Sequence, residues 1–194
     1  MSNIVFHPFV GKNYQAGIND KRILVLGESH YCASTSDVRP TLTTEIIEDL
    51  FDPKSPHEGY KTTYIKFIQA LAGRDLSFQE REELWNRLAF YNYVQVPMVG
   101  PRVAPSSADF ANSEDAFFQV LKQLDPDKII VWGKRLFENM PATGFQGPDI
   151  SIPGFSPANT WIYSNGSKDI LTIPINHPSS GFDSAYWHSV MCFK

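Results

Sequence analysis

The sequence predicts an α/β fold: a three-layer α/β/α sandwich with a central, mainly parallel four-stranded sheet. Short continuous apolar runs alternate with segments of helical periodicity, which is typical of a parallel sheet with crossover helices. The chain has 194 residues, of which 42% are hydrophobic and 20% charged, enough for one domain with a substantial core. No repeat, low-complexity tract or linker interrupts it. We therefore expect residues 1–194 to form a single domain.

The first predicted strand covers residues 23–26, a continuous apolar run closed by Gly27. Such a run is typical of a strand buried on both faces of a parallel sheet. Apolar residues then recur at helical spacing over residues 41–51 and again over 60–72. Each of these segments is bounded by Pro or Gly, so we expect two separate helices after the first strand.

A third helix is predicted to begin at Ser77. Ser77 and Glu80 have the spacing of a capping box, in which each side chain accepts a hydrogen bond from the backbone of the other. The helix is expected to run through Trp85 to Leu88. The following stretch, residues 89–94, is rich in β-forming side chains and predicts the second strand.

The third strand is predicted over residues 128–132. It follows a helix that Asn112 or Ser113 would cap and that reaches Leu124. The next residue after the strand, Gly133, opens another helix. This order of strand, helix and strand favours parallel pairing.

The last part of the chain predicts a long loop, a hairpin and a closing helix. Residues 141–158 are rich in Pro and Gly and show no period. The runs 161–163 and 170–173 flank an Asn-Gly pair, which is a strong hairpin signal. The second of these runs is the fourth strand of the predicted sheet. Residues 182–193 have the pattern of a terminal helix.

Composition and charge narrow the functional classes. A net charge of −4 and a pI of about 5.7 argue against broad nucleic-acid binding through phosphate neutralisation, although a local basic patch or a small-molecule substrate is compatible with them. The two cysteines, Cys32 and Cys192, are too few for a four-cysteine iron–sulfur or zinc site. We expect no metal and no organic cofactor.

No apolar run is long enough to cross a bilayer, and the first residues lack the basic start and apolar stretch of a signal peptide. These observations favour a cytoplasmic protein whose thiols are reduced. We expect a monomer that does not associate with membranes.

Polar residues stand where each predicted strand ends. Glu28 and Ser29 follow the first strand, Asn92 lies near the end of the second, Trp132 ends the third, and His177 follows the fourth. In an open α/β sheet, ligands bind outside the carboxyl ends of the strands. Loops that are far apart in the sequence are therefore expected to meet at one cleft.

In this order the strand ends resemble the motifs of the uracil-DNA glycosylase superfamily. Residues 27–31 (Gly-Glu-Ser-His-Tyr) are similar to its first motif. Asn92 occupies the place of its base-reading asparagine, residues 131–133 (Val-Trp-Gly) resemble its third-strand motif, and residues 177–179 (His-Pro-Ser) match its last motif letter for letter. The resemblance spans roughly residues 22–190 and implies the fold of that superfamily.

The resemblance implies hydrolysis of the N-glycosidic bond of uracil or a related damaged base in DNA, as in base-excision repair. The base would be flipped out or single-stranded, because a duplex hides the reacting bond. The implied catalytic residues are Glu28, which orients water and stabilises the cationic sugar, and His177, which stabilises negative charge on the departing base. Asn92 carries a donor and an acceptor and would read a uracil-like edge. The other implied substrate-binding residues are Gly27, Ser29, His30, Tyr31 and Ser179.

Ser179 and a set of basic residues are the candidates for phosphate contacts. Backbone N–H groups near Ser179 would hold a phosphate at the start of the last helix, although Ser179 could instead cap that helix. The basic side chains within the resemblance are expected to be mainly solvated; they are Lys61, Lys66, Arg102, Lys134 and Arg135.

Three positions depart from the superfamily's pattern. Ser29 stands where the common water-activating aspartate is found, so Glu28 would have to replace it. His30 stands where proline is usual. The aromatic residue that stacks on the base has no clear counterpart, and its candidates are Tyr31, Phe51 and Tyr60. Trp132 and Phe182 are expected in the core.

Two other functions stay open. Residues 27–29 also resemble the Gly-Asp-Ser block of certain lipases and esterases, which would make Ser29 the nucleophile of a serine hydrolase. Pro174 stands where those enzymes place an aspartate, so the His177 partner would lack its usual orienting group. The third possibility is a non-catalytic module that binds single-stranded nucleic acid or a nucleobase-containing small molecule through Asn92 and His177.

Overall fold

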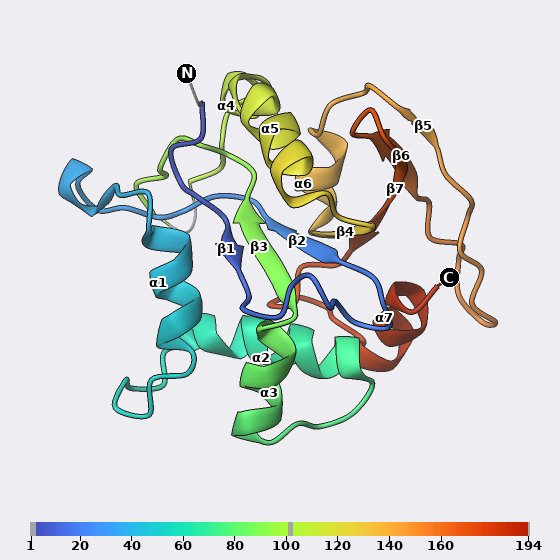
Figure 1. Cartoon of the computed structure of the whole chain (residues 1–194), viewed down its shortest axis with the longest axis horizontal. Coiled ribbons are helices and arrows are strands. Elements are labelled where there is room, and N and C mark those ends of the chain that lie inside the picture. Colours follow the sequence, from blue (N-terminus) through green and yellow to red (C-terminus); the bar gives the residue numbers. More distant parts are fainter. Residues whose placement is uncertain (1–2, 101–102, 194) are drawn as a thin grey trace.

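The computed structural model describes residues 3–100 and 103–193. The chain forms one seven-stranded sheet with helices on both of its faces (Figure 1). The predicted α/β class is confirmed. The strands, in chain order, are β1 (Phe9–Val10), β2 (Ile23–Gly27), β3 (Leu88–Asn92), β4 (Lys128–Trp132), β5 (Phe145–Gln146), β6 (Trp161–Ser164) and β7 (Asp169–Ile175).

The sheet is larger and more mixed than the four-stranded sheet that the sequence predicts. Its order is β1-β3-β2-β4-β7-β6-β5. The neighbours β3, β2, β4 and β7 pair in parallel, whereas β1, β6 and β5 add three antiparallel pairings at the edges. The prediction of four strands was wrong for two reasons. Strands β1 and β5 have only two residues each, too few to produce a periodic pattern, and the hairpin strand β6 also joins the sheet by pairing with β7.

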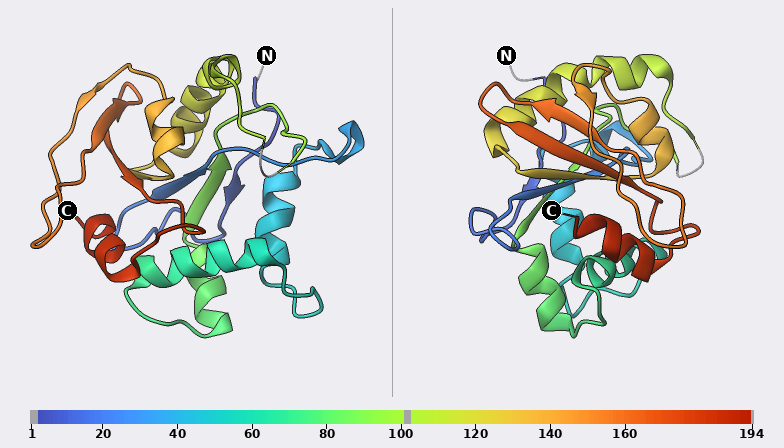
Figure 2. Two further views of the ribbon diagram at one scale, coloured as in Figure 1. Left: turned by 180° about the vertical axis from the view of Figure 1, so that it is seen from behind. Right: turned by 90° about the vertical axis from the view of Figure 1, so that its right-hand side faces the viewer.

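Two groups of helices enclose the sheet (Figure 2). One face carries α4, α5 and α6, and the other carries α1, α2, α3 and α7. The helices are α1 (Leu42–Asp49), α2 (Gly59–Ala72), α3 (Phe78–Trp85), α4 (Ser107–Asn112), α5 (Glu114–Leu124), α6 (Lys134–Glu138) and α7 (Ser184–Met191), with a short 3₁₀ turn at Thr35–Asp37. No helix within the described residues is long and apolar enough to cross a membrane.

The helices on both faces explain the continuous apolar runs of the central strands. In β2, Leu24 and Leu26 enter the core under α5, whereas Ile23 and Val25 enter the core over α2. Successive side chains of a strand point to opposite faces, so a strand covered on both faces has no polar positions. All five residues of β2 are buried.

Most predicted elements are confirmed, with three further differences. Ser113 stands at the N-cap position of α5, but its side chain makes no capping hydrogen bond there. Ser77 and Glu80 form the expected capping box of α3, but that helix ends at Trp85, and Leu88 already belongs to β3. Helix α4 was not predicted. It begins with a second capping box, between Ser106 and Asp109, inside a proline-rich segment that reads as a loop.

Candidate functional site at the strand ends

The carboxyl ends of the four parallel strands lie along one edge of the sheet. Gly27, the last residue of β2, pairs with Asn92, the last residue of β3. Trp132, the last residue of β4, pairs with Ile175 at the end of β7. The loops after β2 and β7 therefore leave the sheet at the same edge, as their placement in the sequence predicts.

The β2 loop is held in place by the loop after β3. The Tyr93 N–H donates to the Gly27 oxygen at 3.0 Å, and the Val94 N–H donates to the Glu28 oxygen at 2.8 Å. Farther along, the Met98 N–H donates to the His30 oxygen at 2.8 Å. These bonds continue the pairing beyond the strands, so they hold the backbone of residues 28–31 in place.

Asn92 and Gly27 meet on the face of the sheet that carries α2. Asn92 is only 5% exposed, and its backbone oxygen accepts a 2.9 Å hydrogen bond from Gln95 Nε2. A Cβ atom at Gly27 would lie 2.2 Å from Asn92 Oδ1 and 2.9 Å from Phe90 Cζ. The Asn92 amide therefore lies over the end of β2, in space that any side chain at position 27 would fill.

His177 lies beside the end of β4. Its ring is 5.9 Å from that of Trp132 at an interplanar angle of 83°, and a Cβ atom at Gly133 would be 3.7 Å from His177 Cβ. The Ser179 N–H donates to His177 Nδ1 at 3.3 Å, and Ser179 Oγ lies 2.7 Å from the same nitrogen. A backbone N–H can only donate, so Nδ1 accepts and the proton of the neutral ring is on Nε2.

The surroundings of His177 favour the neutral ring. Burial lowers the pKa of His177 below its ordinary value, Glu28 opposes this shift, and Arg135 adds to it. A neutral imidazole with its proton on Nε2 is a hydrogen-bond donor that carries no charge into the site. The two neighbouring charges also show that Glu28 and Arg135 lie within electrostatic reach of the ring.

Glu28 is bound by Arg135, a residue of α6. Arg135 Nε donates to Glu28 Oε2 at 2.7 Å, and Arg135 Nη2 donates to Glu28 Oε1. The pair is thus bidentate, with the carboxylate side chain 15% exposed and the guanidinium side chain 58% exposed. Tyr31 lies close to this pair: burial raises its pKa, Glu28 raises it further and Arg135 lowers it.

Trp132, the aromatic neighbour of His177, packs against a second aromatic side chain, Tyr64. Trp132 is 3% exposed, and Tyr64 of α2 packs against it edge to face at 5.2 Å. Trp132 is in the core, as expected. Its Nε1 atom, however, is buried and has no hydrogen-bond partner in the described part of the chain. A buried donor without a partner is costly, on the order of 1–3 kcal/mol. Four other buried side-chain atoms of the described residues also lack a partner, and they belong to Tyr14, Ser29, Tyr91 and Thr172.

His30 is not brought to the other site residues. It is 2% exposed and packs against Phe6 with ring centroids 4.6 Å apart. Its Nε2 atom is 2.9 Å from Thr43 Oγ1 of α1, and burial lowers its pKa to about 4. The side chain therefore anchors the loop to α1 and the N-terminal segment, while only its backbone belongs to the loop at the strand ends.

Ser29 and Ser179 do not take the expected places. Ser29 Oγ is buried without a hydrogen-bond partner among the described residues. Ser179 does not begin the last helix, because α7 starts at Ser184 and is capped by the side chain of Asp183. The expectation that Ser179 stands at the start of the last helix is therefore wrong. The role that the structure gives Ser179 is to fix the ring of His177.

The expected stacking residues are also distributed differently. Phe51 packs against Phe78, and the Tyr60 hydroxyl donates to Asp49. The Tyr60 ring also contacts that of Tyr64, whereas Tyr31 lies within electrostatic reach of Glu28 and Arg135. Phe182 stacks on Trp187 and packs in the core, as expected. Among the basic candidates, Lys61 is buried and pairs with Asp49, and Arg102 lies outside the described residues.

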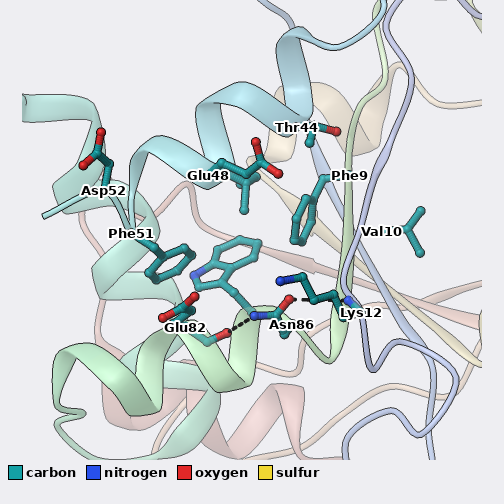
Figure 3. Close-up of a pocket in the computed structure, with 11 residues that line it drawn as sticks. Phe9, Val10, Lys12, Thr44, Glu48, Phe51, Asp52, Glu82 and Asn86 are labelled. Atoms are coloured by element: carbon teal, nitrogen blue, oxygen red, sulfur yellow. Dashed lines mark hydrogen bonds between the residues drawn. The ribbon is translucent and has the colours of Figure 1, made fainter. Parts of the chain in front are cut away.

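A separate cavity of about 330 Å³ lies at the other end of β3 (Figure 3). Phe9, Phe51 and Trp85 line it together with Glu48 and Glu82. None of the strand-end residues contributes to it. We place the functional site at the strand ends because the candidates Glu28, Asn92 and His177 gather there, whereas Phe51 is the only functional candidate among the residues that line the cavity beside α1 and α3.

Side chains that could ligate a metal ion do not cluster in the described residues. Over residues 3–100 and 103–193, no three His, Cys, Asp or Glu side chains are placed so that they could hold a metal ion. Cys32 and Cys192 are free thiols. Comparison with models of known protein families found no match, and comparison with curated protein sequences found none either.

Sequence reasoning missed Tyr64 as a site residue, and it gave Arg135 only as one of five basic candidates for phosphate contacts. Arg135 was one of several basic residues on a predicted helix, and Tyr64 was one of several apolar residues on the face of another. For Arg135 a signal existed: it follows the strand-ending residues 132–133 directly, so it had to lie near the edge of the sheet. For Tyr64 the sequence carries no signal that separates it from its core neighbours.

Proposed function

We propose that the protein is a uracil-DNA-glycosylase-like hydrolase, which cleaves the N-glycosidic bond of uracil or a related base in DNA. The observation that carries this proposal is the meeting of three groups at one sheet edge: the Asn92 amide over Gly27, the His177 ring with its proton on Nε2, and the Glu28 carboxylate. In the proposed reaction the amide reads the base, the imidazole stabilises the leaving-group oxygen, and the carboxylate stabilises the sugar cation.

The proposed mechanism assigns one step to each residue. The Asn92 amide donates to the base carbonyl and accepts from the base N–H, which selects a uracil-like edge. As the bond between the base and C1′ breaks, negative charge develops on the base, and His177 Nε2–H stabilises it by a hydrogen bond. Glu28 stabilises the positive charge on the sugar and orients the water that adds to C1′.

Tyr31, Tyr64 and Trp132 complete the proposed base site. Tyr31 lies beside the Glu28–Arg135 pair and influences the pKa of Tyr64, so the two tyrosines lie close to one another. The Trp132 Nε1–H has no partner among the described residues. A ligand acceptor would satisfy it, which would explain why a buried donor is left unpaired.

One observation favours a second candidate, a non-catalytic module that binds a nucleobase. Both oxygens of Glu28 are engaged by Arg135, and a carboxylate held in this way is less free to orient water. The base-reading groups Asn92 and His177 would act unchanged in such a module. No observation favours the serine hydrolase, because Ser29 Oγ lacks a partner in the described chain and His177 Nδ1 is bonded to Ser179 instead.

The test of the proposed function is excision of uracil from a single-stranded oligonucleotide, with wild type compared with Asn92→Asp and His177→Ala. Asn92→Asp removes the donor of the amide, and His177→Ala removes the donor to the leaving base. We expect losses of about 100-fold or more in each variant, the usual scale for one such donor. His57→Ala, which changes an exposed histidine outside the site, is the control. Full activity in both site variants would overturn the mechanism.

A further inference from the structure

Arg135 and Glu28 form a bidentate ion pair whose two side chains differ in exposure. Arg135 is 58% exposed and Glu28 only 15%, so the guanidinium lies on the solvent side of the pair and the carboxylate on the inner side. Glu28 is also within electrostatic reach of His177. An approaching ligand can therefore reach Arg135 more readily than Glu28.

A guanidinium group matches a phosphate as well as a carboxylate. Its planar N–H groups bind two oxygens of either group side by side, and exchange between the two costs little geometric rearrangement. The neighbouring Lys134 is exposed, and no ion pair joins it to another described residue. A phosphate that arrives at Arg135 would therefore meet a second positive charge, whereas Glu28 would lose the guanidinium.

We propose that Arg135 binds a phosphate group of the ligand, and that this exchange releases Glu28 from its ion pair. The inference rests on the proposed function in one respect: it takes the ligand to be a nucleotide. In the structure the carboxylate is bound by the guanidinium. Phosphate binding leaves the carboxylate free beside the base and the sugar.

The exchange restricts the site to ligands that carry a phosphate. A free nucleoside can contact Asn92 and His177, but it leaves Glu28 paired with Arg135. A mononucleotide or a nucleic-acid strand supplies the competing group. Arg135 is thus a positioning residue that couples recognition of the ligand's backbone to the state of Glu28.

Binding of three probes tests the proposal without base excision. The probes are 2′-fluoro-2′-deoxyuridine, its 5′-monophosphate, and a single-stranded trinucleotide with the same residue in the centre. The fluorine withdraws electrons from C1′ and so prevents cleavage during the measurement. The ratio of each phosphate-bearing probe's affinity to that of the nucleoside is its phosphate advantage. The two phosphate-bearing probes distinguish a free nucleotide from a strand as the source of the phosphate.

We expect a phosphate advantage of about tenfold in wild type, the scale of one charge-assisted bidentate pair. Arg135→Gln should abolish it. Glu28→Gln should increase it by about threefold, because the competing carboxylate is gone. The double variant should show no advantage. Matched controls are Lys122→Gln, at an exposed position of α5, and Glu138→Gln, at an exposed position of α6, which remove the same charges away from the pair; each should change the advantage by less than about twofold.

The proposal is overturned if Arg135→Gln keeps the full advantage with both phosphate-bearing probes, or if Glu28→Gln acts no more strongly than Glu138→Gln. Absence of binding by all three probes overturns it as well. Its failure is distinguishable from failure of the proposed function. A phosphate advantage that depends on Arg135 without uracil excision leaves a binding module, whereas excision without that dependence leaves the hydrolase and removes the exchange.

Discussion

The side-chain oxygen of Asn92 lies over Gly27, where a Cβ atom would be only 2.2 Å away. The two residues end neighbouring strands in direct register. Because Gly27 has no side chain, the Asn92 amide can lie over the end of β2. The proposed base site uses the amide in that place.

Gly27→Ala should therefore displace the Asn92 amide. The added methyl group would clash with Asn92 Oδ1 and with the Phe90 ring, so we expect a loss of about 1–3 kcal/mol in the free energy of unfolding and a much weaker affinity for a nucleobase ligand. Chemical denaturation and ligand titration measure the two effects. Gly59→Ala is the control, because nothing lies within 4 Å of its Cβ position. Normal ligand affinity in Gly27→Ala would contradict the role given to the Asn92 amide.

The pKa of His177 should respond in opposite directions to its two charged neighbours. Glu28 raises this pKa and Arg135 lowers it. We expect Glu28→Gln to lower the pKa of His177 and Arg135→Gln to raise it. NMR titration of the imidazole nitrogens measures both shifts and also reports which nitrogen is protonated. Shifts in the same direction in the two variants, or a neutral ring with its proton on Nδ1, would contradict the arrangement.

His30 should make the protein less stable as the pH falls. Burial lowers its pKa to about 4 in the folded state, whereas an unfolded chain has a histidine pKa of about 6.5. Between these two values the unfolded chain binds a proton that the folded chain does not. The contribution of His30 to the free energy of unfolding is therefore fully present above about pH 6.5. It is lost as the pH falls toward 4, which lowers the free energy of unfolding by up to about 3 kcal/mol.

Denaturation of wild type, His30→Gln and His57→Gln between pH 7 and pH 4.5 measures this contribution. The fall in stability should be smaller in His30→Gln and unchanged in His57→Gln, since His57 is exposed. Equal falls in all three proteins would show that His30 is not the buried, neutral group described above.

The local patterns of the sequence predict the central strands and most helices, because each of these elements buries its own apolar residues. The strand ends follow from the same patterns, and they place Glu28, Asn92 and His177 at one edge. The sheet's outer strands could not be predicted. Strand β1 has two residues, and its place beside β3 depends on tertiary packing rather than on local sequence.

The contacts between side chains that are far apart in the sequence also could not be predicted. Arg135 and Glu28 are 107 positions apart in the chain. The sequence around either residue therefore does not indicate that the two side chains form an ion pair. His30 illustrates the converse: it lies inside the motif-like loop, but its buried contacts with Phe6 and Thr43 belong to the core. A motif fixes the course of the backbone more reliably than the direction of each side chain.

The rate of uracil release from a single-stranded oligonucleotide under single-turnover conditions tests the central claim most directly. Wild type should release free uracil and leave an abasic site, and both Glu28→Gln and His177→Ala should slow this release by about 100-fold or more. Glu138→Gln should keep the wild-type rate. Uracil release that is equally fast in wild type, Glu28→Gln and His177→Ala would contradict the account, and so would binding of the oligonucleotide by wild type without any release.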